Sequence, residues 1–280
     1  MWVTNAAGDS VTEIGWRPGS HPIVRSGPGY GFLKPGAITA GHDRLWVADD
    51  VAHAIFELNA SDGSLVRKIT KVAAPGSLLL FGNRLWVTNP AANTIYLINT
   101  RTGSKVRAFR HIGLRYPSAL AVSHRLLWVA NEAKDTVTVM SATTGAWKAT
   151  LRGSRFGLSQ PVAEVAGRTM LWVASTPRTI TQINTVSRKP VRIISGSRFR
   201  LGVPGPMALA DGKLWVLNTA GNSVTEIDAA TGRLVAVFAG RAYGFDHPVG
   251  IAAHNHAIWI ASASSLTRLV PPASRSRAMP

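Results

Sequence analysis

Five segments of the chain place an arginine close to an aromatic ring and end on a proline. They read RSGPGYGFLKP, RHIGLRYP, RGSRFGLSQP, SGSRFRLGVP and GRAYGFDHP. Guanidinium groups attract phosphate and aromatic rings stack on bases, which is how proteins hold single-stranded nucleic acid without reading its sequence. The candidate binding residues are Tyr30, Phe32, Arg115, Tyr116, Arg155, Phe156, Arg198, Phe199, Arg200, Arg241, Tyr243, Phe245 and His247. The alternative is structural: the rings tuck each segment against the protein, with arginine stacked on top.

The histidine and carboxylate side chains give weaker support for a catalytic site than the arginine-aromatic segments give for a binding site. A hydrolase or lyase needs an acid and a base that converge on one point. The histidines at 53, 111, 124, 254 and 256 do not have the spacing of metal ligands. We therefore expect no catalytic residue, no metal ligand and no cofactor. We would expect a bound magnesium or calcium ion only if the protein is an enzyme.

A tryptophan-centred apolar triplet sets the architecture that must position these residues. It recurs seven times, with its tryptophans 40 to 44 residues apart, and a proline stands eleven residues before each tryptophan after the first. The tryptophans are Trp2, Trp46, Trp86, Trp128, Trp172, Trp215 and Trp259. Repeats of this length, each with four strand-like pieces joined by turns rich in Gly, Asn and Asp, are typical of β-propeller blades. The arginine-aromatic segments are then the loops from one blade's outer strand to the next blade's inner strand.

Counting these strand-like pieces predicts an all-β, seven-bladed propeller of four-stranded antiparallel blades. The second and third strands occur seven times each, whereas the inner and outer strands occur six times each, which makes 26 strands. We expect the first blade to lack its inner strand and the last blade its outer strand. Residues 1–270 are expected to form one domain, and the polar tail 271–280 is expected to be disordered. Trp2 should pack like the other tryptophans of the repeat.

Glu164 departs from the repeat on a predicted inner strand. Eight residues before each tryptophan the chain has Ile38, Leu78, Leu120, Glu164, Met207 and Ile251. A carboxylate in this row is costly unless it is paired or reaches water in the central channel. Glu164 is therefore a channel candidate, with a local salt bridge as the alternative.

Composition limits the classes of partner. The chain has 280 residues and a formal net charge of +17, which favours polyanions or anionic surfaces, although a basic solvated surface would give the same total. No cysteine is present, so disulfides and thiolate sites are excluded. No apolar run is long enough to span a membrane, and Asp9 and Glu13 interrupt any signal peptide. We expect a monomer, and the compartment stays open.

The repeat also resembles a known group of propellers. The stretches LWVTN…NTIYLINTRTG and LWVLN…NSVTEIDAATG are similar to YVTN/NHL-type repeats, a group that includes YncE-like proteins and virginiamycin B lyase. Relatives of this kind are often exported. The lyase resemblance implies histidine and glutamate at the channel mouth with magnesium. However, the positions that would supply glutamate hold Asn5, Asp49, Asn89, Asn131, Ser175, Asn218 and Ser262.

Taken together, these features favour a non-catalytic propeller that binds through one basic face rimmed with aromatic residues. The expected ligand is a polyanion, with single-stranded nucleic acid suggested by the YncE resemblance. A metal-assisted lyase or hydrolase at the channel mouth is one alternative. An extracellular sensor or protein-interaction module is another.

Overall fold

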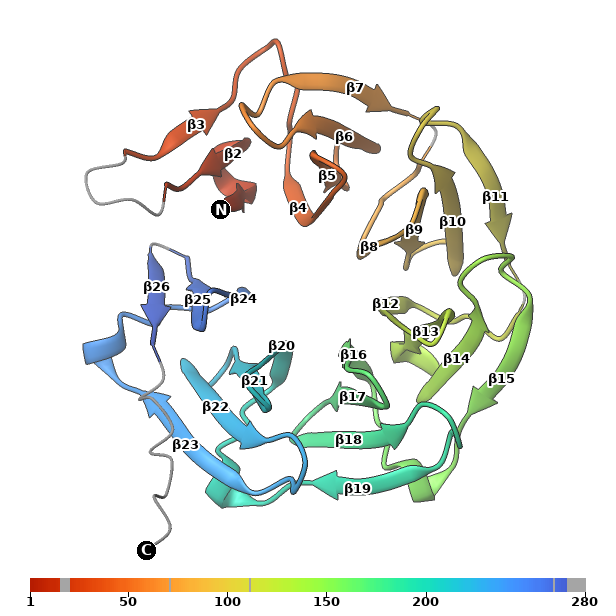
Figure 1. Ribbon diagram of the computed structural model, residues 1–280, viewed down its shortest axis with the longest axis vertical. Helices are drawn as coiled ribbons and strands as arrows, with labels where there is room; N and C mark the ends of the chain where they lie inside the picture. The colour runs from red at the N-terminus through yellow and green to blue at the C-terminus, as the bar shows by residue number, and fades with distance from the viewer. Residues whose placement is uncertain (16–20, 71, 111, 264, 271–280) are drawn as a thin grey trace, which may run out of the picture.

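Antiparallel sheets arranged radially around one axis make up the molecule (Figure 1). The computed structural model describes residues 1–15, 21–70, 72–110, 112–263 and 265–270. Seven sheets follow one another along the chain, and we number them blades 1 to 7. The predicted disordered tail at 271–280 lies outside the described residues.

The blades have the following strands. Blade 1 has β1 (Trp2–Asn5), β2 (Ser10–Glu13) and β3 (Ile23–Arg25), and blade 2 has β4 (Pro35–Gly41), β5 (Arg44–Asp49), β6 (Ala54–Asn59) and β7 (Leu65–Ile69). Blade 3 has β8 (Leu78–Phe81), β9 (Arg84–Asn89), β10 (Thr94–Asn99) and β11 (Lys105–Phe109), and blade 4 has β12 (Pro117–Ser123), β13 (Leu126–Asn131), β14 (Thr136–Ser141) and β15 (Trp147–Leu151). Blade 5 has β16 (Pro161–Ala166), β17 (Met170–Ser175), β18 (Thr179–Asn184) and β19 (Pro190–Ile194), and blade 6 has β20 (Pro204–Ala210), β21 (Lys213–Asn218), β22 (Ser223–Asp228) and β23 (Leu234–Ala239). Blade 7 has β24 (Gly250–His254), β25 (Ala257–Ala261) and β26 (Leu266–Leu269).

The strand count confirms the predicted seven-bladed propeller. Five sheets have four strands, whereas the first and last have three. Within the described residues, blade 1 has no inner strand beside β1, and blade 7 has no outer strand beside β26. The helical segments described are 3-10 turns: η1 (Ala6–Gly8), η2 (Glu132–Lys134), η3 (Ser154–Phe156), η4 (Ser197–Phe199) and η5 (Arg241–Tyr243). No helix in the described part of the chain has the length and hydropathy to cross a bilayer.

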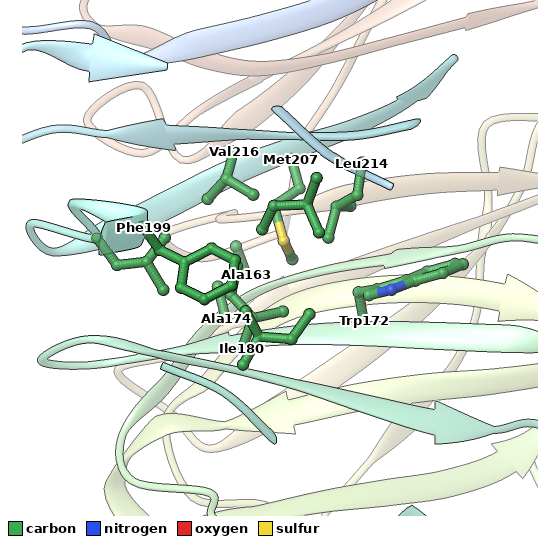
Figure 2. Packing of buried hydrophobic residues seen from close by; sticks show 11 residues of the cluster. Ala163, Trp172, Ala174, Ile180, Phe199, Met207, Leu214 and Val216 are labelled. Atoms are coloured by element: carbon green, nitrogen blue, oxygen red, sulfur yellow. The ribbon is translucent and has the colours of Figure 1, made fainter. Parts of the chain in front are cut away.

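The repeated tryptophans fill the wedges between neighbouring blades. Five of them are buried, and in the cluster of Figure 2 the indole of Trp172 lies among side chains of blades 5 and 6. Trp86 Nε1 donates a hydrogen bond to Ala142 O of the next blade at 3.1 Å, and Trp2 Nε1 does the same to Ala60 O at 3.2 Å. Trp2 thus makes the contact expected of it, but it is only half-buried because its blade lacks an inner strand.

The loops that cross between blades define one face of the ring. Outer-to-inner loops, such as 152–160, and second-to-third-strand loops, such as 131–136, emerge on this face because successive strands alternate in direction. We call it the crossover face. The turns joining inner to second strands and third to outer strands lie on the opposite face.

Candidate functional site

Most aromatic rings of the crossover loops are buried. Phe156 is 0% exposed and Phe199 is 2% exposed, and Phe32 and Phe245 are buried as well. Figure 2 shows Phe199 pointing into the cluster between blades 5 and 6, beside Val216 and Ile180. These four rings anchor the loops, as the structural alternative proposed, and they do not present a face on which a base could stack.

The tyrosines of the first and last of these loops add to the same packing. Tyr30 stacks on Phe32 with ring centroids 5.4 Å apart, and its hydroxyl donates to Gly63 O at 3.1 Å. Tyr243 stacks on Phe245 at 5.6 Å. Both tyrosines are half-buried. The two tyrosines therefore stabilise the first and last crossover loops of the propeller, and their aromatic faces are not free to bind a ligand.

A short 3-10 turn holds two of these phenylalanines, Phe156 in η3 and Phe199 in η4. In η3, Phe156 N donates to Gly153 O at 3.0 Å, and Gly153 has a φ of 98°, a conformation that favours glycine. Thr181 Oγ1 of β18 then donates to Phe156 O at 2.6 Å. Thr225 Oγ1 of β22 makes the equivalent bond to Phe199 O at 2.8 Å. The glycine thus permits the turn, and the threonine hydroxyl attaches the turn to the following blade.

The arginines beside these rings stay in solvent. The guanidinium of Arg155 lies 5.0 Å from the centroid of Phe156, and that of Arg198 lies 4.9 Å from the centroid of Phe199. Both arginines and Arg200 are exposed. Figure 1 shows the short coils that follow β15, β19 and β23 at the outer edge of the ring. These arginines therefore stand on the rim of the crossover face, away from its centre.

Cations accumulate on one part of this face. Over blades 4 to 6 the crossover loops and second-to-third-strand loops expose Arg110, Arg115, Lys134, Arg152, Arg155, Arg178, Arg198 and Arg200, which we call the cationic arc. In the described part of the chain, none of these side chains comes within 4.0 Å of a carboxylate to form a salt bridge. The side chain of Arg241, another sequence candidate, lies outside what the structure describes.

Positive charge is not confined to the crossover face. The turns of the opposite face carry Arg44, Arg84, Arg101, Arg125, Arg168, Arg188, Lys189 and Arg233. The expectation of a single basic face is therefore too simple. Both faces therefore carry cations on consecutive blades, but on the opposite face Arg44 and Lys213 pair with Glu57 and Asp228.

Tyr116 is the one phenylalanine or tyrosine among the sequence candidates that is exposed, at 47%. Its backbone N donates to Asn93 Oδ1 at 2.7 Å, which holds the loop between blades 3 and 4, and Arg115 beside it is exposed. The ring borders a hollow of about 410 Å³ that Lys34 and Asp50 also line. Lys34 Nζ and Asp50 Oδ2 are 3.7 Å apart, so this central hollow has a partly neutralised wall.

His247 does not form part of an acid-base cluster. It is exposed, its Nδ1 lies 2.8 Å from Asp246 Oδ1, and its backbone N donates to Asn222 Oδ1 at 3.0 Å. No three His, Asp or Glu side chains of the described residues gather closely enough to hold a metal ion.

The polar residues at the ends of the second strands are caps. Asp49 is fully buried, and its carboxylate accepts hydrogen bonds from the backbone N of Leu33, Lys34 and Ala52 at 2.8 to 2.9 Å. Asn131 Nδ2 donates to Thr138 Oγ1 at 3.0 Å. The polar atoms of Asp49 and Asn131 are thus used within the fold, whereas Ser175 Oγ, Asn218 Oδ1 and Ser262 Oγ make no hydrogen bond in the described part of the chain. This set contains no histidine or glutamate and therefore does not fit the donors that the lyase resemblance implies.

Glu164 is a buried acid without a partner. The residue as a whole is partly exposed, yet both carboxyl oxygens are buried and neither accepts a hydrogen bond of normal geometry. Burial raises the pKa of Glu164 well above its ordinary value, and the nearby backbone N–H groups of Ala130 and Ala121 offset this only in part. The salt-bridge alternative is not observed in the described part of the chain, and burial at the blade 4–5 boundary favours the neutral form of the side chain.

One exposed ring escaped the sequence analysis. Trp147, the first residue of β15, is 56% exposed and borders a hollow of about 490 Å³. Trp147 is not one of the repeated tryptophans, so the repeat assigns it no packing position between blades. That departure from the repeat is the signal by which the sequence could have marked it as a candidate.

The fold and the site define the protein as a seven-bladed β-propeller with a partly cationic crossover face. Searches against family models and against curated proteins find no match. Solved structures match well. Virginiamycin B lyase from Staphylococcus aureus aligns with a TM-score of 0.80 and 18% identity over 95% of this chain and 89% of that chain.

Two further structures belong to the same comparison. A catalytically inactive variant of the Staphylococcus aureus lyase with quinupristin gives a TM-score of 0.82 at 18% identity, over 95% of this chain and 89% of that one. A streptogramin B lyase gives 0.70 at 19% identity, over 87% and 84%. At these identities the likeness establishes a shared fold. Since no family model matches, the finer expectation of a YVTN/NHL-type repeat stays a prediction.

Proposed function

We propose that this protein is a non-catalytic propeller that binds a polyanion along the cationic arc, with single-stranded nucleic acid as the preferred ligand. The observation that carries the proposal is the absence of salt bridges in the arc: its exposed arginines and lysines have no carboxylate partner among the described residues. Phosphates spaced along a strand neutralise such a row by releasing counterions.

The acidic groups support this proposal by their placement. Glu57 of β6 is buried between Arg44 and Arg67, and Asp49 caps its own loop. Asp228 pairs with Lys213 at 2.8 Å on the opposite face. These carboxylates lie outside the cationic arc. Glu132 and Asp135 are the carboxylates within its loops, and the cations of the arc outnumber them.

A direct binding experiment tests the proposal. Fluorescence anisotropy of a labelled oligothymidylate at low salt should show saturable binding to the wild-type protein. The double variant Arg198→Ala with Arg200→Ala should bind more weakly, whereas Arg101→Ala with Arg233→Ala on the opposite face should bind as the wild type does. Absence of wild-type binding at low salt would refute the proposal.

A lyase is the second candidate, and the fold likeness together with the central hollow beside Tyr116 favours it. Against it stand the missing glutamates and the absence of a metal-holding cluster in the described residues. Incubation with quinupristin and Mg²⁺, followed by mass spectrometry, decides between the two. We expect intact quinupristin, and conversion of it would establish the lyase.

A further inference from the structure

Blade 4 has a hollow on its outer side that opens next to the cationic arc. Its volume is about 490 Å³, and it lies between the loop at Gly113 and the outer strand β15. Trp147 forms one wall, and Lys134, Lys148 and Arg152 line it as well. We call it the blade-4 hollow.

Blade 4 also differs from other blades in lacking an aromatic ring at two positions of the repeat. Five residues before the proline, the loops entering blades 2 to 7 carry Tyr30, Thr70, Ile112, Phe156, Phe199 and Tyr243. At the matching register of the third strand, opposite the residue after the repeated tryptophan, these blades carry Phe56, Tyr96, Thr138, Thr181, Thr225 and Thr267. Of these six blades, blade 4 alone has no aromatic residue at either position. The hydroxyl of Thr138 lies beside Gly113, which lines the hollow, so the hollow borders one of these two positions.

Trp147 presents a flat apolar surface to this space. Its Nε1 donates to Thr150 Oγ1 at 3.2 Å, which lays the indole along β15 in the direction of the crossover loop. The side chain is nevertheless 56% exposed. An exposed tryptophan with its polar atom already bonded offers a stacking face with little further ordering cost.

The charged side chains that line the hollow are all cationic, and the nearest acidic residue in the sequence, Asp135, is not among the lining residues. Lys134, Lys148 and Arg152 are exposed, and none forms a salt bridge within the described residues. No carboxylate is among the described residues that line the hollow. Lys134 and Arg152 also belong to the cationic arc, so the hollow is continuous with it.

We infer that the blade-4 hollow is a nucleotide subsite, in which a base stacks on Trp147 and the adjoining phosphates lie against Lys134 and Arg152. The inference rests on the proposed function and identifies where a strand on the arc engages a base. A flat face beside cations suits a nucleobase with its phosphate, whereas an acidic peptide would use the cations and leave the ring free.

Three probes of equal length test this inference by anisotropy: an oligothymidylate of about ten nucleotides, the same backbone with abasic residues, and a polyglutamate. Trp147→Ala should weaken oligothymidylate binding about 5- to 100-fold, since one stacked base contributes roughly 1–3 kcal/mol. Trp147→Phe should retain most of the affinity because it keeps a stacking face. Binding of the abasic strand should not change in either variant.

The outcomes separate the subsite from the proposed function. If Trp147→Ala binds oligothymidylate like the wild type while Arg198→Ala with Arg200→Ala binds weakly, the subsite is wrong and polyanion binding stands. If polyglutamate binding shows the same dependence on Trp147, the base-stacking inference is overturned. If the wild type binds none of the probes at low salt, the proposed function itself fails.

Discussion

The guanidinium of Arg198 lies 4.9 Å from the ring centroid of Phe199, with the arginine in solvent and the ring buried between two blades. The two neighbouring residues have different roles, one in packing and one in presenting a charge. The ring fixes the loop on blade 6, and the loop fixes the position of the charge. The following predictions separate these roles.

Phe199→Ala should lower the free energy of unfolding by about 3–5 kcal/mol, because it leaves a cavity in the cluster between blades 5 and 6. Arg198→Ala should cost at most about 1 kcal/mol, the usual contribution of an exposed cation–π contact. Urea unfolding of both variants measures the difference. Equal losses would show that the packing role of the ring is misassigned.

Asp49→Ala should be destabilising, because it leaves three backbone N–H groups of two partly buried loops without their acceptor. Each unsatisfied buried donor costs about 1–3 kcal/mol. Asp49→Asn keeps one acceptor oxygen and should fall between Ala and the wild type. Thermal and urea unfolding test the order, and a neutral effect of Asp49→Ala would contradict the capping role.

Glu164 should make stability depend on pH in a defined direction. Its pKa is raised in the folded state, so above the ordinary pKa of glutamate the unfolded chain loses the proton first and unfolding is favoured. The stability contributed by the neutral acid is complete at low pH and is lost as pH rises toward the folded pKa. Relative to the wild type, Glu164→Gln should therefore gain stability with rising pH. Urea unfolding across a pH series measures this, and a difference that does not change with pH would contradict it.

The architecture could be predicted from the sequence because its period is carried by large residues with fixed packing. Trp46 and Trp86 stand at one register of successive blades, and the turn residues between strands mark each hairpin. The strand count followed from these markers, including the incomplete first and last blades.

The site was harder to predict because sequence adjacency does not reveal which side chain faces inward. Arg155 and Phe156 are neighbours, yet one is exposed and the other buried, as the 3-10 turn η3 dictates. Trp147 could have been singled out from the sequence because it is a tryptophan that stands outside the repeat. Whether Glu164 reached water depended on packing between inner strands, which the sequence does not show.

The salt dependence of oligothymidylate binding tests the central claim most directly. For wild-type protein, log K should fall linearly with log salt concentration, with a slope of about −0.7 for each phosphate contacted. Arg198→Ala with Arg200→Ala should give a shallower slope, and the opposite-face control Arg101→Ala with Arg233→Ala should keep the wild-type slope. Binding that is absent at low salt, insensitive to salt, or equally affected by both double variants would contradict a polyanion site on the cationic arc.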